Sequence, residues 1–148
     1  MTDSSDLIKL YSSRILALAA DIPHLGRLDS PQASVRKRSP LCGSTVTVDL
    51  NLEDGRVAGF AQEVKACALG QAAAAILGEA VLGRTAAELA RAEAELEAML
   101  TANAPAPAPP FQGFEALIPA REFRNRHASI LLSVRAAAEA ARLASSVP

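Results

Sequence analysis

Three side chains of this protein could together bind a soft metal ion: Cys42, Cys67 and His127. The two cysteines are the only cysteines among 148 residues, and the histidine follows a proline-rich stretch. Thiolate and imidazole groups are ligands that transition metals and iron–sulfur clusters prefer. We therefore treat these residues as a candidate metal or iron–sulfur site.

The local sequence around each residue supports this interpretation to a different degree. Cys42 lies between Pro40 and Gly43, which predicts an accessible turn. Cys67 begins an alanine-rich helical pattern, where unpaired N–H groups and the helix dipole stabilise a thiolate. His127 is expected near the start of the last helix. The spacing matches no zinc finger, so buried inert cysteines and a surface histidine remain the competing interpretations.

Composition and charge narrow the class of protein. The length suits a single domain over residues 1–148, and a core of Leu, Ile, Val and Ala is expected because only 3% of the residues are aromatic. A net charge of −1 argues against nucleic acid or an anionic membrane as the partner. No apolar stretch approaches the roughly 20 residues of a membrane span, and signal-peptide features are lacking. We expect a cytoplasmic protein with reduced cysteines.

Periodicity predicts the elements of the first half of the chain. Apolar residues at helical spacing predict a helix over 6–20. Alternation from Thr45 predicts a half-buried strand with Asp49 among its polar positions, and Asp54-Gly55 predicts a tight turn into a second strand over 56–64. A weaker third strand is expected near 34–38, within an otherwise polar loop.

Helices dominate the second half. The pattern predicts an alanine-rich helix over 68–82 and a helix over 85–101 that begins with a capping box. The Pro/Ala-rich loop at about 104–110 is predicted to be an extended tether. A short turn is expected over 114–118, and a long helix over 126–144. The expected fold is α+β: a small antiparallel sheet of about three strands, packed against several helices.

Short segments spread over nearly the whole chain occur in a familiar order. They are Tyr11-Ser12, Pro23 with Gly26 and Leu28, the loop 39–44, the turn 54–57, the helix start 65–72, the turn 83–85 and the segment 126–131. As an ordered series they resemble the IscU/NifU/SufU family of iron–sulfur cluster assembly scaffolds, and the resemblance implies a single NifU N-terminal-like domain.

The resemblance implies a function without enzyme activity. Iron and sulfide would be assembled into a [2Fe-2S] cluster on the protein and passed to recipient apo-proteins, with sulfur supplied by a cysteine desulfurase. Cys42 and Cys67 would be cluster ligands, and His127 would occupy the family's histidine position. The family fold, an antiparallel sheet with helices mainly on one face, agrees with the predicted elements.

The chain departs from the family pattern at three positions. Ala128 stands in place of the third cysteine, Ser44 in place of an aspartate, and Ala66 in place of a glycine. Two thiolates and one imidazole are one ligand short of the usual four. Ser44, water or an external thiol could complete the set in a monomer, and a homodimer could share four cysteines. Zn²⁺ is the alternative occupant of such a site.

Two other functions follow from these departures. The chain could be a degenerate scaffold-like module that binds zinc or no metal and contacts the sulfur-transfer machinery. A hydrolytic zinc enzyme is the weakest interpretation, because no Glu or second His lies at a spacing that would supply a general base.

Overall fold

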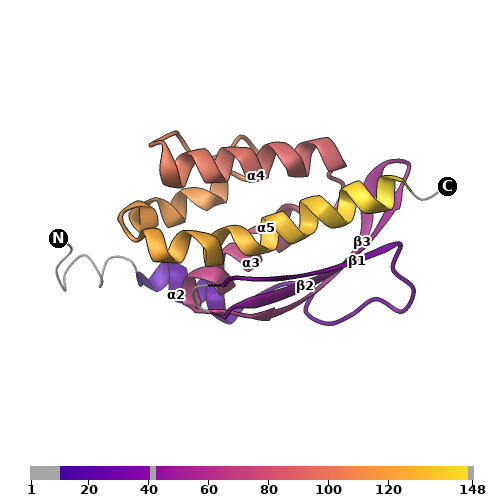
Figure 1. Cartoon of the computed structure of the whole chain (residues 1–148), viewed down its shortest axis with the longest axis horizontal. Helices are drawn as coiled ribbons and strands as arrows, with labels where there is room; N and C mark the ends of the chain where they lie inside the picture. Colours follow the sequence, from indigo (N-terminus) through magenta and orange to yellow (C-terminus); the bar gives the residue numbers. More distant parts are fainter. Residues whose placement is uncertain (1–10, 41–42, 147–148) are drawn as a thin grey trace.

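The computed structural model describes residues 11–40 and 43–146. These residues form an α+β fold with one antiparallel sheet and a long C-terminal helix, as predicted (Figure 1). In chain order the elements are α2 (Ser13–Ala20), β1 (Ala33–Arg38), β2 (Thr45–Glu53), β3 (Arg56–Lys65), α3 (Ala68–Ala80), α4 (Ala86–Thr101), the 3-10 helix η1 (Gln112–Glu122) and α5 (Arg124–Ser145).

The sheet has the order β1-β2-β3, and both strand pairs are antiparallel. Asp54 and Gly55 join β2 to β3 with φ angles of 52° and 77°. Positive φ at both central residues matches the right-handed twist of a two-residue hairpin, so the Asp-Gly signal predicted this turn correctly. The weak pattern near 34–38 also predicted β1 correctly.

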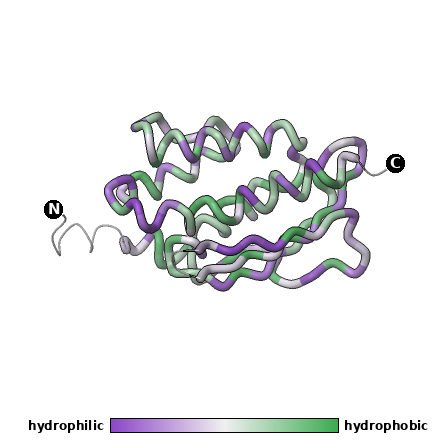
Figure 2. The backbone as a smooth tube through the Cα atoms, viewed as in Figure 1, coloured by the Kyte–Doolittle hydropathy of each residue, from purple (hydrophilic) through white to green (hydrophobic). Residues whose placement is uncertain are grey.

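The helices pack in layers on the sheet. Figure 1 shows α5 lying along the sheet, with α4 on the side of α5 that faces away from the strands. Helix α3 packs against α5 and against α2. Figure 2 shows hydrophobic and hydrophilic residues interspersed along both α4 and α5. Helix α5 is therefore the central element of the molecule.

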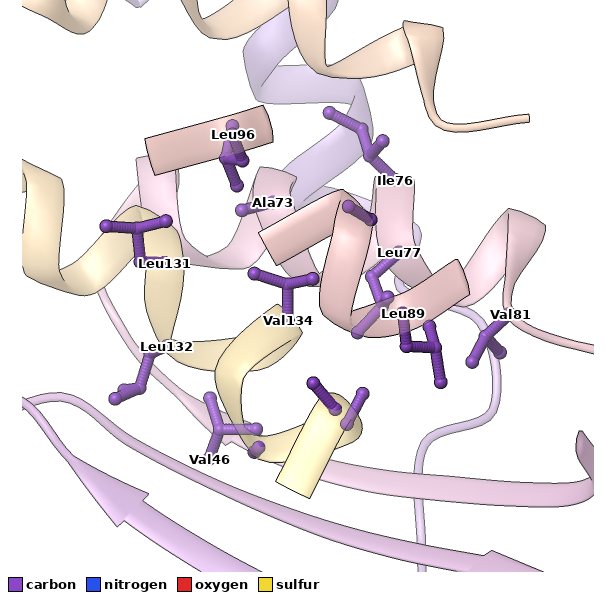
Figure 3. Close-up of a cluster of buried hydrophobic side chains, with 14 of the residues drawn as sticks. Val46, Ala73, Ile76, Leu77, Val81, Leu89, Leu96, Leu131, Leu132 and Val134 are labelled. Atoms are coloured by element: carbon purple, nitrogen blue, oxygen red, sulfur yellow. The ribbon is translucent and has the colours of Figure 1, made fainter. Parts of the chain in front are cut away.

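The hydrophobic core is built from aliphatic side chains and many alanines, as the composition predicts. Figure 3 shows side chains from β2, α3, α4 and α5 meeting in one cluster, among them Val46, Leu77, Leu89 and Val134. Alanines of α3 and α5 are almost completely buried. Small side chains let two helices approach closely, which compensates for the shortage of large aromatic residues.

Two predictions for the first half of the chain are wrong. The described part of the predicted 6–20 helix begins only at Ser13, because Ser12 is its N-cap and accepts a hydrogen bond from the Ile15 amide at 3.3 Å. The rest of that prediction lies outside the described residues. Asp49, expected on a solvated face, is completely buried. Residues 27 and 28 cover it by hydrogen bonding to its carboxylate.

Two segments of the second half are also more ordered than predicted. In place of a short turn, η1 runs from Gln112 to Glu122 and includes Pro119. The Pro/Ala-rich loop contains no regular element over 102–107, but it packs on its neighbours: the Ala108 amide donates to Glu95 at 3.2 Å, and Ala106 lies against the core. Such contacts attach the loop to α4, so it is no free tether.

Candidate functional site

The candidate thiol Cys67 lies at the junction between β3 and α3. It is the N-cap residue of α3, with extended backbone angles (φ −66°, ψ 169°), and it is half-buried. Its side chain makes no cap hydrogen bond. The helix N–H groups beyond it are oriented toward this end, where they favour a negatively charged sulfur. The predicted position of Cys67 at a helix start is therefore correct.

Cys42 lies outside the described residues. The residues that follow it in the chain are described, and their positions are known. Thr45 of β2 is paired with Lys65 of β3, so the chain before Thr45 and the chain after Lys65 leave the hairpin at the same end. Gly43, directly after Cys42, has a φ of 70° that favours glycine. The register therefore brings Gly43 and Ser44, which directly precede β2, to the same end of the sheet as Cys67.

Two buried serines connect this loop to Cys67. Ser44 Oγ lies 3.3 Å from Ser129 Oγ, and Ser129 Oγ lies 3.5 Å from Cys67 Sγ. The two serines are 4% and 2% exposed, so water does not compete for these contacts. Ser129 belongs to α5, and the contact therefore joins three elements distant in the sequence. We refer to Ser44 and Ser129 as the hydroxyl pair.

His127 is oriented differently. Its Nε2 lies 3.0 Å from both the Ala120 and the Arg121 carbonyl oxygens, at the end of η1, and the residue is only 9% exposed. Because both partners are acceptors, Nε2 carries a proton, and in the neutral ring the lone pair is on Nδ1. His127 and Ser129 are two residues apart on α5, which is a rotation of about 200°, so their side chains leave opposite sides of the helix.

The structure thus unites some of the candidate residues and separates others. Ser44 and Cys67 converge on Ser129, whereas the His127 ring faces η1. Within 11–40 and 43–146, no group of three or more His, Cys, Asp or Glu side chains is close enough to hold a metal. Sequence reasoning missed Ser129 as a site residue. Its position next to Ala128 in the segment 126–131 was the only signal that could have indicated it.

Arg121, near the end of η1, has a structural role. Arg121 donates from Nε to the Met99 carbonyl at 2.7 Å and from Nη2 to the Ala104 carbonyl. These hydrogen bonds satisfy a carbonyl at the end of α4 and one at the start of the Pro/Ala-rich loop, and hold both against η1. Arg121 also lines a surface pocket together with Arg124 and His127.

The fold belongs to the class of small α+β proteins. At one end of its sheet, the loop before β2 meets the start of α3, where the Cys67 thiol lies. The family model described as NifU-like N terminal domain matches residues 10–108 of the chain. A crystal structure of a nitrogen-fixing NifU-like protein (N-terminal) from Brucella abortus is 41% identical, with a TM-score of 0.93 over 97% of this chain and 99% of that chain. The chain belongs to the family of NifU-like N-terminal domains.

Two more distant structures share the fold. A putative iron–sulfur cluster assembly scaffold protein for the SUF system, from Fervidobacterium islandicum AW-1, is 18% identical, with a TM-score of 0.78 over 89% of this chain and 96% of that chain. A hypothetical protein is 22% identical, with a TM-score of 0.75 over 90% of this chain and 97% of that one. The comparison with curated proteins returned no match. No helix in the described part of the chain has the length and apolar character needed to cross a membrane.

Proposed function

We propose that this protein is an iron–sulfur cluster assembly scaffold or carrier, and that its cargo is iron or a [2Fe-2S] cluster. Membership of the NifU-like family supports this function, and a structural relative is described as a putative scaffold of the same kind. In this role the protein catalyses no reaction. It receives sulfur from a cysteine desulfurase, holds the cluster, and releases it to recipient apo-proteins.

The observation that carries the proposal is the convergence of the Cys42 loop and Cys67 at one end of the sheet. The β2–β3 register and the Ser44–Ser129–Cys67 contacts both bring these segments together. Two thiol ligands carried on short, separate segments would be the minimum for ligating a cluster edge or a single metal ion. Cys67 also stands at the N-cap of α3, beside the unpaired N–H groups of the first helical turn.

The remaining ligands are proposed from the donor atoms. His127 would ligate through Nδ1, since metal-bound histidines commonly donate their other N–H to a backbone carbonyl, as Nε2 does here. Its ring would need to reach the cysteines from the η1 side. Ser44 Oγ is the oxygen donor nearest in sequence to Cys42. Water, an external thiol or the cysteines of a second copy are the other candidates for the fourth position.

Anaerobic reconstitution with iron and sulfide tests this function. We expect near-stoichiometric iron and acid-labile sulfide, with visible charge-transfer bands, in the wild-type protein. Cys42→Ser and Cys67→Ser should each lose the bands, because either change leaves a single thiolate. Ser133→Ala, a buried serine one turn beyond Ser129 on α5, is the control and should keep them. A full cluster in both cysteine variants would contradict the proposal.

The contribution of His127 is tested separately with a matched histidine. The chain has two histidines, and the exposed His24 adopts a positive φ of 61° that asparagine tolerates well. We expect His127→Asn to lower the cluster content and His24→Asn to leave it unchanged. Equal cluster content in the two variants would remove His127 from the ligand set.

The second candidate function is a scaffold-like module that binds Zn²⁺ or no metal. It is favoured by one observation, that His127 is hydrogen-bonded to η1 on the side of α5 opposite Ser129. In this case metal analysis should find zinc or no metal, without sulfide even after reconstitution. Co-purification of a cysteine desulfurase together with that result would establish the alternative.

A further inference from the structure

Within the described part of the chain, the hydroxyl of Ser129 does not have the hydrogen-bond partner that a buried serine on a helix commonly has. A buried hydroxyl on a helix commonly bonds to a carbonyl one turn earlier on its own helix. The side chain of Ser129 instead contacts a sulfur at 3.5 Å, at the start of α3, and a second hydroxyl at 3.3 Å, in the loop before β2. Ser129 therefore links the two cysteine-bearing segments through its side chain.

Space for this hydroxyl depends on a glycine in the facing helix. A Cβ atom at Gly70 of α3 would lie 2.6 Å from Ser129 Oγ and 2.8 Å from the Ala66 Cβ. A Cβ atom does not approach other non-bonded atoms this closely, so any larger residue at position 70 would displace the Ser129 side chain. Gly70 has an ordinary helical backbone, which means that close approach, and not backbone conformation, requires the glycine here.

The chemistry of the three groups fixes the direction of hydrogen bonding when Cys67 ligates a metal. A thiolate sulfur accepts hydrogen bonds and donates none, so Ser129 must donate its only proton to Cys67. The bond between the serines then requires Ser44 to donate to Ser129. In this arrangement the lone pairs of Ser44 Oγ point away from Ser129. When Cys67 is a neutral thiol, the order of donors can reverse.

We propose that Ser129 is a positioning residue, which holds the Cys67 sulfur in place and connects it through Ser44 to the Cys42 loop. The inference rests on the proposed function and adds a residue to it. The O–H···S bond draws electron density from the sulfur, so the metal–thiolate bond is weaker than it would be without the donor. Ser129 therefore sets both the geometry and the strength of one protein ligand.

Titration with Co²⁺ alone tests this role through the thiolate-to-cobalt charge-transfer band. Loss of the donor raises the energy of the sulfur electrons, so Ser129→Ala should move the band to longer wavelength. Affinity for Co²⁺ should still fall about tenfold, because the loss of an outer-shell partner that holds Cys67 in place outweighs the stronger metal–thiolate bond. Ser133→Ala removes an equally buried hydroxyl whose oxygen has no partner among the described residues, and it should change neither value.

A second pair of variants keeps the test valid if Ser129→Ala folds poorly. Gly70→Ala retains the hydroxyl but displaces it, and should shift the band in the same direction. Gly78→Ala, on the same helix, places its Cβ 2.7 Å from Pro23 and far along α3 from Ser129, so it controls for damage to α3 itself. Equal effects of the two glycine variants, or an unshifted band in Ser129→Ala, would overturn the inference.

Failure of the proposed function is distinguishable from failure of this inference. If the wild-type protein binds no Co²⁺, the thiolate metal site is wrong, and the metal-free protein still reports on Ser129. The Raman S–H stretching band of Cys67, identified by its loss in Cys67→Ser, should shift in Ser129→Ala and stay in place in Ser133→Ala. A Cys67 band that is identical in the wild type, Ser129→Ala and Ser133→Ala would overturn the positioning role.

Discussion

Asp49 shows how one buried carboxylate can attach a loop to the sheet. Burial by itself raises the pKa of Asp49, but hydrogen bonds from Arg27, Ser34 and the Leu28 amide, together with the Arg27 charge, outweigh it and hold the pKa below its ordinary value. Arg27 Nε and the Ser34 hydroxyl both lie 2.7 Å from carboxylate oxygens. The loop after α2 is thereby fastened to β2, on the face away from the helices.

This arrangement predicts a specific dependence of stability on pH. A carboxyl whose pKa is lowered by folding stabilises the protein above its unfolded pKa of about 3.9, and the contribution is lost as pH falls through the folded value. Asp49→Asn should lower the free energy of unfolding by about 2 kcal/mol at pH 7 and reduce the loss on acidification. Urea denaturation at pH 7 and pH 3 measures both. Asp29→Asn, an exposed position nearby, is the control and should behave as wild type.

At the scale of elements, the N-terminus of α4 is fixed by a reciprocal cap. Thr85 Oγ1 accepts from the Glu88 amide at 3.1 Å, and the Glu88 carboxylate accepts from the Thr85 amide at 3.4 Å. Glu88 also pairs with Arg84 and with Arg56 at the start of β3. The cap therefore joins the helix to the hairpin as well as satisfying its own amides.

We expect Thr85→Ala to reduce the free energy of unfolding by about 1 kcal/mol, because the first-turn amides lose their acceptor. Thr85→Ser keeps the hydroxyl and should remain close to wild type. Chemical denaturation followed by circular dichroism measures the difference. If the alanine variant were as stable as the serine variant, the capping box would contribute nothing to the stability of the protein.

At the scale of the whole molecule, α5 determines how the layers fit. It packs against β1, β2, α3 and α4, and its buried positions include four alanines without exposed area, Ala136, Ala137, Ala140 and Ala141. A layer built on small side chains has no room for larger ones, since protein interiors are close-packed. The site depends on the same fit, because Ser129 on α5 must reach both Cys67 and Ser44.

Enlarging one of these alanines should therefore destabilise the whole molecule. Ala137→Leu at a completely buried position is expected to cost about 1–3 kcal/mol through overpacking and to lower the unfolding temperature. Ala94→Leu, on the exposed face of α4, should change stability by no more than about 0.5 kcal/mol. Differential scanning calorimetry compares them. Similar unfolding temperatures for both variants would show that the α5 layer is loosely packed.

The amino-acid sequence alone determined the elements that local physics controls. Strand alternation, the positive-φ pair Asp54-Gly55, the capping box at Thr85 and the alanine-rich pattern predicted β2, β3, α3 and α4 to within a few residues, since each depends on neighbours in the chain. The order of the motifs indicated the family, and the helix start predicted the setting of Cys67. The single-domain division and the ligand set remain predictions.

Only the tertiary structure determined which side chains from remote segments lie against each other. Alternation placed Asp49 on a solvated face, but a distant loop buries it, and no local pattern encodes a partner 22 residues away. Ser129 became a site residue only because α5 crosses the sheet end where the two cysteine-bearing segments meet. His127 bonds to η1 because helical rotation turns it away from Ser129. Such relations arise from packing between remote segments, and residue type and spacing do not specify them.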